Sequence, residues 1–201
     1  MLCKLCNNPV IKISDTRNNW EFLHCENCEF IFKNPFYYVS SEDELKQYNN
    51  HNNTMDSPGY VEMFEKFMED TFLEYIESIK NVLEFGSGPG PVLSELLKQR
   101  ALNVDIYDKY FSPQKVYEGK EYDLITSTEV IEHIENPKEI FQFFASHIKS
   151  GGYLALMTQF HTNVPEEFKK WWYKNDPTHI CFFRPYTFEV LARENGFKVL
   201  K

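Results

Sequence analysis

Residues 82–90, Val-Leu-Glu-Phe-Gly-Ser-Gly-Pro-Gly, most constrain what this chain can fold into. A short apolar run enters three alternating glycines, Gly86, Gly88 and Gly90, and a leucine-bearing segment that begins at Pro91 follows at once. Glycine has no Cβ, so the backbone can approach a ligand closely, and proline suits the first turn of a helix. The pattern predicts a strand, a tight turn and a helix, as at nucleotide sites of open α/β sheets.

Four of the five cysteines lie in the first 28 residues, in two Cys-x-x-Cys pairs that 18 residues separate: Cys3, Cys6, Cys25 and Cys28. This spacing is typical of a zinc site. Four thiolates complete a tetrahedral shell with no open position, so we expect a structural ion. Two disulfides are the alternative, but intracellular chains keep thiols reduced. Apolar runs at residues 10–13 and 20–24 predict a hairpin, and with it a zinc ribbon over residues 1–34.

The remaining chain alternates segments of helical and strand character. Polar residues 35–56 predict a linker with a short helix at 42–48, and His51 in its Asn-rich end could reach a ligand. Ser57 and Pro58 predict a helix that runs to about Ile79. A later helix is expected to start at Asn136 and to end at the glycines 151–152. Strands are expected at residues 103–108, 122–127, 153–158 and 197–200, and the last helix at 185–195.

Charge and hydropathy limit the classes of partner that this chain can bind. The formal net charge is −9 and no run of Lys or Arg is longer than two, which argues against a nucleic-acid partner. No apolar run approaches the ~20 residues of a membrane span, and the N-terminus lacks a signal-peptide pattern. We therefore expect a cytoplasmic protein without a membrane partner.

Asp108 ends the strand expected at residues 103–108 and lies 18 residues beyond Gly90. A carboxylate near this spacing accepts the hydroxyl protons of a ribose in nucleotide-binding folds. The alternative is a strand-end aspartate that caps a turn. Asp105 is the poorer ribose ligand because it lies inside the strand.

The glycine loop, the strand-end acid and the run Tyr-Asp-Leu-Ile-Thr-Ser-Thr-Glu-Val-Ile-Glu-His from Tyr122 complete a pattern. The chain resembles class I S-adenosylmethionine-dependent methyltransferases over roughly residues 57–200. Dehydrogenases are disfavoured because the last glycine of their Gly-x-Gly-x-x-Gly would fall at Pro91. The resemblance implies a Rossmann-like, mostly parallel sheet flanked by helices, with Asp108 holding the cofactor's ribose. It assigns the cofactor's methionine moiety to Glu84 and the loop residues Gly86, Ser87, Gly88 and Gly90, and adds Glu129 to the cofactor site.

One departure from the family is large. Only 13 residues separate Asp108 from Tyr122, too few for the usual helix, strand and helix. We expect the sheet to lack the family's third strand, and the acid that contacts adenine cannot be placed. Tyr110 or Phe111 could stack on the adenine instead. The sequence ends after one strand of the family's terminal hairpin, so we expect an incomplete sheet edge or a shortened chain.

The residues that follow the strand expected at 122–127 have side chains capable of acid–base chemistry. Glu129, Glu132 and His133 stand at i, i+3 and i+4, on one face if this segment is helical. With His179 they could bind Mg²⁺ or another divalent cation, and His133 and His179 are the candidate catalytic residues. The same pattern resembles ubiquinone-pathway O-methyltransferases and small-RNA 2′-O-methyltransferases, which implies a metal that holds acceptor hydroxyls. Two other interpretations remain open: His179 acts as a base without a metal, or the cluster is only structural.

These observations predict a ribbon at residues 1–34, a linker at 35–56 and a methyltransferase domain at 57–201. The reaction we expect is methyl transfer from S-adenosylmethionine to an oxygen of a small molecule, with carbon and nitrogen acceptors open. Two alternatives stay: an RNA methyltransferase whose ribbon grips nucleic acid, and a non-catalytic scaffold that binds the cofactor. Residues 171–173, Trp-Trp-Tyr, are expected to form a lid or a pocket wall. The oligomeric state is open.

Overall fold

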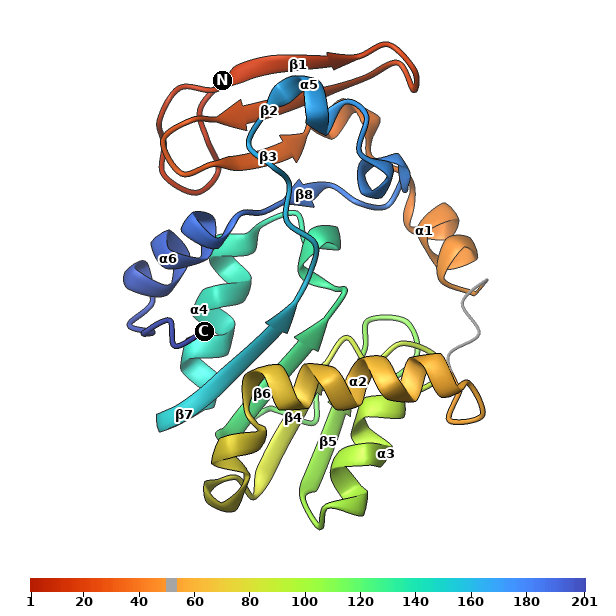
Figure 1. The fold of residues 1–201 in the computed structure, drawn as a ribbon, viewed down its shortest axis with the longest axis vertical. Helices are drawn as coiled ribbons and strands as arrows, with labels where there is room; N and C mark the ends of the chain where they lie inside the picture. Colours follow the sequence, from red (N-terminus) through yellow and green to blue (C-terminus); the bar gives the residue numbers. More distant parts are fainter. Residues whose placement is uncertain (50–53) are drawn as a thin grey trace. The chain divides into compact units, whose positions relative to one another are not determined.

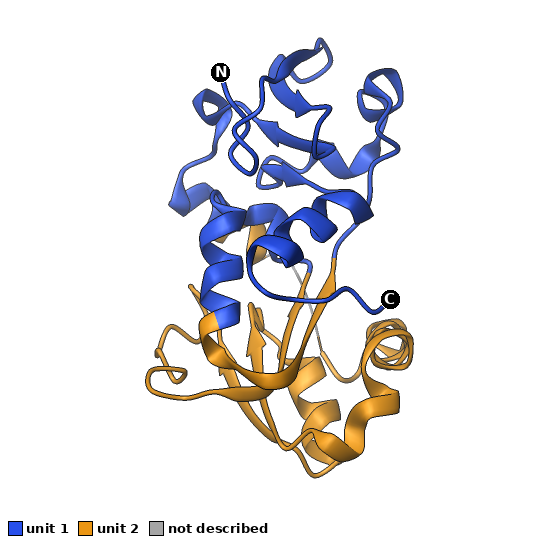
Figure 2. Ribbon diagram, turned by 90° about the vertical axis from the view of Figure 1, so that its left-hand side faces the viewer, with its two compact units in different colours: residues 1–44, 129–145, 158–200 blue, residues 45–128, 146–157, 201 orange. Residues whose placement is uncertain are grey.

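The computed structural model describes residues 1–49 and 54–201, so the prediction for His51 lies outside the described residues. The chain forms two compact units, shown in different colours in Figure 2. Unit 1 contains residues 1–44, 129–145 and 158–200, and unit 2 contains residues 45–128, 146–157 and 201. Each unit has its own four-stranded sheet. None of the helices in these described ranges is long and apolar enough to cross a membrane.

The sheet of unit 2 is parallel and has the strand order β5-β4-β6-β7. Parallel strands share one carboxyl edge, so the loop after the central strand β4 lies at the same edge as the ends of β5 and β6. This edge is where ligands bind in open α/β sheets. The strands are β4 (Asn81–Phe85), β5 (Asn103–Tyr107), β6 (Tyr122–Thr128) and β7 (Ile148–Met157).

Two amphipathic helices, α2 (Pro58–Thr71) and α3 (Val92–Gln99), lie beside β4 and β5 (Figure 1). Their apolar stripes are buried against the sheet, as the three- and four-residue spacing predicts. The buried set includes Phe64, Phe67 and Met68 of α2, Leu93, Leu96 and Leu97 of α3, and Val82 and Leu124 of the sheet.

The helix expected to reach Ile79 is shorter. It ends at Thr71, whose hydroxyl donates to the Phe67 carbonyl at 2.5 Å, and a 3-10 helix η2 (Leu73–Ser78) follows. Side-chain bonds to the carbonyl four residues back compete with the helical pattern and bend helices. Ser57 makes no side-chain capping bond, although Pro58 does open the helix.

The fold class expected from the sequence is confirmed, including the absence of a third strand. The segment between β5 and β6, described in full, contains only an isolated bridge between Asp108 and Ser112. The strand expected at residues 197–200 does not form. The Phe197 N–H instead donates to the Ala192 carbonyl, which closes α6 (Pro185–Glu194) at the left-handed Gly196.

The glycines at 151–152 do not end a helix. Helix α4 (Pro137–His147) stops earlier, and both glycines lie inside β7. A Cβ on Gly152 would stand 2.9 Å from the backbone oxygen of Asp123 on β6. The glycine is therefore required by the close approach of two strands, which a sequence reading confuses with a helix stop.

Unit 1 contains an antiparallel sheet with the strand order β1-β2-β3-β8. The hairpin expected from the two apolar runs is present, with Ile13 opposite Phe22. A third strand follows it, and a two-residue strand from far along the chain pairs Phe182 with Ile31. The strands are β1 (Ile11–Asp15), β2 (Trp20–Cys25), β3 (Phe30–Lys33) and β8 (Cys181–Phe182).

Short helices complete unit 1: α5 (Pro165–Phe168), the 3-10 turns η1 (Pro35–Tyr37), η3 (Ile131–His133) and η4 (Trp172–Asn175), and α6. Helices α1 (Ser41–Tyr48) and α4 begin in unit 1 and end in unit 2. The core of unit 1 joins the ribbon strands to these late segments. It contains Ile13, Phe22, Ile31, Phe168, Tyr173 and Phe182.

Candidate functional site

The glycine loop after β4 has the backbone that its sequence predicts. Gly86 has a φ of 84° and Gly88 a φ of 64°, in the left-handed region that favours glycine. The Gly86 N–H donates to the Tyr107 carbonyl at 2.7 Å, which folds the loop against the end of β5. The loop is therefore ordered by its own backbone.

Asp108 follows β5 and uses both carboxylate oxygens on backbone donors. Its Oδ2 accepts the Gly88 N–H at 2.9 Å. Its Oδ1 accepts the N–H groups of Tyr110 at 2.8 Å and Phe111 at 3.0 Å. A carboxylate oxygen has room for about two hydrogen bonds, so Oδ2 keeps acceptor capacity. Asp108 thus caps a turn, the alternative raised above, and is also bonded to the glycine loop.

Four buried polar atoms at the carboxyl ends of β4 and β6 have no hydrogen-bond partner within the described part of the chain. They are Glu84 Oε2, Ser87 Oγ, Thr126 Oγ1 and Ser127 Oγ. Native proteins rarely leave such atoms unsatisfied, because each loses its bonds to water on burial. Glu84 and Thr126 are also register partners on neighbouring strands. Their position on adjacent strands indicates a polar ligand at this edge.

Glu84 is only 3% exposed. Burial raises the pKa of its carboxyl to about 8, partly offset by hydrogen bonds from the backbone and hydroxyl of Ser94 on α3. A buried acid of this kind is stabilised as an anion when a cationic group arrives. Glu84 is therefore suited to the positively charged methionine moiety that the resemblance assigns to it.

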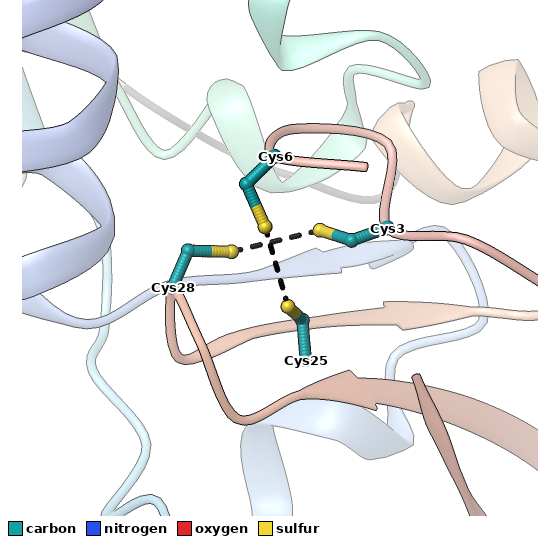
Figure 3. Close-up of side chains that lie close together, drawn as sticks. All are labelled: Cys3, Cys6, Cys25 and Cys28. Carbon is teal, nitrogen blue, oxygen red and sulfur yellow. Dashed lines mark hydrogen bonds between the residues drawn. The ribbon is translucent and has the colours of Figure 1, made fainter. Parts of the chain in front are cut away.

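The four N-terminal cysteines converge, and their sulfur atoms face one point in Figure 3. Cys3 Sγ lies 3.5 Å from Cys28 Sγ, and Cys6 Sγ lies 3.4 Å from Cys25 Sγ. A disulfide would need about 2.0 Å, and all four cysteines are free. Zinc–sulfur bonds of about 2.3 Å place the sulfurs of a tetrahedron about 3.8 Å apart. The donor set and spacing fit a closed zinc site.

A second group of ligand atoms comes from Glu132, His133 and His179. One ligand atom from each lies within 4.8 Å of the others. The helical face expected for Glu129, Glu132 and His133 is wrong, because η3 covers only residues 131–133 and Glu129 is left-handed with a φ of 52°. Glu129 is outside this group of atoms among the described residues, but its carboxyl is hydrogen-bonded to that of Glu132.

Backbone carbonyls fix both histidine rings. His133 Nδ1 lies 3.1 Å from the Thr178 oxygen, and His179 Nδ1 lies 2.8 Å from the Tyr173 oxygen. A carbonyl only accepts, so each Nδ1 carries the proton and the neutral ring has its lone pair on Nε2. Burial and the neighbouring His179 lower the pKa of His133 to about 3, so it stays neutral. Metal-binding histidines are commonly held in this way.

Tyr173 joins the two glutamates. Its hydroxyl lies 2.6 Å from Glu132 Oε1 and 2.9 Å from Glu129 Oε2, and the Thr158 hydroxyl donates to Glu132 Oε2 at 3.1 Å. One phenol has one proton, so it can donate to only one carboxylate at a time. Burial and the charge of Glu129 raise the pKa of the fully buried Glu132 to about 8.

Sequence reasoning missed this role of Tyr173. The prediction of a lid or pocket wall covers Tyr173 together with Trp171 and Trp172, but the structure places the three side chains in different environments. Tyr173 is buried, Trp171 packs against the core of unit 1, and Trp172 is 68% exposed. The only available signal was the nearness of Tyr173 to His179 in the chain.

Residues 60–201 match the family described as a methyltransferase domain. No curated protein matches the chain. Solved structures that resemble it include the plantazolicin methyltransferase BpumL with a pentazolic desmethylPZN analog and SAH, at 17% identity and a TM-score of 0.47, covering 77% of this chain and 70% of that one.

Two further solved structures resemble the chain at similar identity. A SAM-dependent methyltransferase, possible histamine N-methyltransferase, from Thermotoga maritima has 16% identity and a TM-score of 0.41, over 79% of this chain and 78% of that one. The YcgJ protein from Bacillus subtilis has 15% identity and a TM-score of 0.42, over 63% of this chain and 68% of that one. At identities this low, the methyl acceptor has to be inferred from the residues of this chain.

Proposed function

The chain belongs to the methyltransferase-domain family, as its resemblance to S-adenosylmethionine-dependent enzymes led us to expect, and we propose that it methylates an oxygen of a small molecule. In this proposal a divalent ion at Glu132, His133 and His179 holds the acceptor hydroxyl. A zinc ion at the four N-terminal cysteines folds the ribbon.

The cofactor assignment draws on the carboxyl edge of the parallel sheet. Glu84 would face the positively charged methionine moiety, and Asp108 would accept from the ribose with the remaining capacity of Oδ2. The unpartnered hydroxyls of Ser87, Thr126 and Ser127 would bind further polar atoms of the cofactor. Methyl transfer is a displacement at a sulfonium, so orientation of the two reactants is the main task of the protein.

The metal assignment rests above all on the two histidines with Nδ1–H bonded to backbone carbonyls, beside a buried carboxylate. Two imidazoles and one carboxylate, with open positions, suit a catalytic divalent ion. Such an ion would lower the pKa of an acceptor hydroxyl and fix its direction. Tyr173 and Thr158 support Glu132 from behind, as outer partners of metal ligands do.

The acidic balance supports a small-molecule acceptor. With a net charge of −9, the chain would repel a polyanion unless a basic face were present. Binding of a short RNA that weakens steeply with added salt would instead favour the RNA methyltransferase alternative.

Calorimetry with S-adenosylmethionine, beside elemental analysis of the purified protein, tests this proposal. We expect one cofactor per chain, one zinc, and a second divalent ion after incubation with Mn²⁺. A Glu132→Ala/His179→Ala variant should keep the cofactor and the zinc and lose the second ion. The matched control is Glu139→Ala/His147→Ala on α4, which removes the same two group types elsewhere.

Absence of cofactor binding under reducing conditions would contradict the enzyme assignment. Wild type that binds no ion beyond the zinc would contradict the metal and leave His179 as a metal-free base.

A further inference from the structure

The segment that carries His179 is bonded at two points to buried charged residues of the ribbon, Asp15 and Lys33. Residues 173–180, named here the histidine segment, supply the carbonyls of Tyr173 and Thr178 that fix the rings of His179 and His133. The position of this backbone therefore sets the direction of both Nε2 atoms. Any group that holds the segment also orients the proposed ligands.

The first such group is a buried ion pair. Lys174 has a fully buried side chain, and its Nζ donates to Asp15 Oδ2 at 2.7 Å and to Asn175 Oδ1 at 2.9 Å. Asp15 is the last residue of β1 and is 4% exposed. Asn18 donates to both acceptors at 3.0 Å, which closes a ring of hydrogen bonds between the hairpin turn and the segment.

The second group is Lys33, the last residue of β3, which is also fully buried. Its Nζ donates to the Pro177 carbonyl at 2.8 Å and lies 4.0 Å from the centre of the Trp20 ring. Its backbone N–H donates to the Ile180 carbonyl at 2.8 Å. Ile180 in turn donates to the Glu132 carbonyl at 2.8 Å, so the ribbon and the turn that bears Glu132 meet through one residue.

Stability alone explains these groups poorly. Replacing a buried ion pair with apolar residues of similar volume is often neutral or stabilising, because burial of two charges costs as much as their attraction returns. The pair does specify geometry, since its bonds fix where Lys174 and Asn175 lie against β1. Such fixed partners are expected where a site must be held to a fraction of an ångström.

We propose that Asp15, Lys174 and Lys33 are positioning residues for the acceptor site, and that the ribbon is in this way part of the machinery for methyl transfer. The inference rests on the proposed function, since it concerns the histidines assigned there. The ribbon sets the tautomer and direction of His133 and His179 through the histidine segment, without touching substrate or cofactor.

A Lys174→Met variant tests this, with Lys12→Met as the matched control. Lys12 makes an exposed ion pair with Glu21 on the same ribbon, so its amine is bonded within the hairpin. Long-range ¹H–¹⁵N spectra of the histidine rings report which nitrogen carries the proton, without any metal. We expect the Nδ1–H tautomer for His133 and His179 in wild type and Lys12→Met, and a mixture of tautomers in Lys174→Met.

A folded Lys174→Met protein that keeps both Nδ1–H tautomers would overturn the inference. Where this variant does not fold, Asp15→Leu/Lys174→Met removes both charges and leaves no buried ion unpaired. The same spectra then decide.

A Co²⁺ titration of the zinc-loaded proteins separates this inference from the proposed function. We expect about tenfold weaker binding at the second site in Lys174→Met than in Lys12→Met, the usual effect of losing outer support. Equal affinities in the two variants count against positioning. Wild type that takes up no Co²⁺ contradicts the proposed metal only, and the tautomers still test positioning.

Discussion

The Asp108 carboxylate accepts the backbone N–H of Gly88 at 2.9 Å, which joins the end of β5 to the glycine loop after β4. The same carboxylate holds the N–H groups of Tyr110 and Phe111. Asp108 therefore shapes the glycine loop, which we propose as the cofactor site, and its Oδ2 keeps acceptor capacity.

Asp108→Asn should weaken S-adenosylmethionine binding by about tenfold or more, because hydrogen bonds to charged groups contribute about 1.5–3 kcal/mol. The amide keeps one oxygen and turns an NH₂ group toward a backbone donor, so one side of the loop loses its partner. Calorimetry measures the change. Asp105→Asn is the control, since Asp105 pairs with Lys120 and Tyr122 instead of the loop. Equal affinity of the two variants would refute this role of Asp108.

Cofactor binding should depend on pH through Glu84. Burial raises its pKa to about 8, and a cationic ligand lowers it again, so binding below that pH releases a proton. Affinity should rise with pH up to about 8 and then level off. Calorimetry in two buffers of different ionisation enthalpy measures the released proton, which should vanish above about pH 9. Glu95→Gln on the exposed side of α3 should leave the profile unchanged.

Stability gives an independent check on Glu84. Between its unfolded pKa of 4.5 and its folded pKa of about 8, the folded protein binds a proton that the unfolded chain releases. The free energy of unfolding of wild type should therefore fall, relative to Glu84→Gln, as pH rises through this window. Urea titrations at several pH values measure the difference. Parallel curves for the two proteins would show that the carboxyl titrates normally.

The sequence was informative where the pattern is local. The glycine loop and the apolar stripes of α2 and α3 follow from residue spacing, and the missing third strand follows from the short segment compared with the family's usual pattern. The helical face of Glu129, Glu132 and His133 failed because a left-handed residue in the turn leaves no periodic signal. Strand β8 has only two residues, and its pairing with β3 depends on a partner far away in the chain.

The same limit explains the groups that the sequence missed. Tyr173 reaches Glu132 across 41 residues of sequence, and Lys174 reaches Asp15 across 159. No spacing rule links positions so distant in the sequence. Lysine is usually a surface residue, so the sequence gives no sign that Lys33 and Lys174 are buried. The ligand atoms could be listed from the sequence, whereas the groups that orient them required the fold.

Tyr173→Phe should lower the affinity for a divalent ion at the second site by about tenfold, as expected for an outer partner. The ring packing against His179 and Trp171 is kept, and only the hydroxyl between Glu129 and Glu132 is lost. Without that donor the two carboxylates repel each other more strongly, so the pKa of Glu132 should rise further. Co²⁺ absorption measures the affinity. An unchanged titration would assign the phenol to packing alone.

Zinc should be present at one equivalent per chain and should be lost selectively with the cysteine cluster. Cys6 is the least buried of the four, so Cys6→Ser removes a ligand with little loss of packing. We expect a zinc content well below one equivalent, and faster hydrogen exchange in β1 and β2, because such small modules fold with their metal.

Cys181→Ser is the control. Its fully buried thiol donates to the Ile134 carbonyl, a bond that a hydroxyl can keep, and it lies outside the cluster. If Cys6→Ser kept a full equivalent of zinc, the metal would have to be held elsewhere. If wild type held none after purification without chelator, the ribbon would have to fold on its apolar core alone.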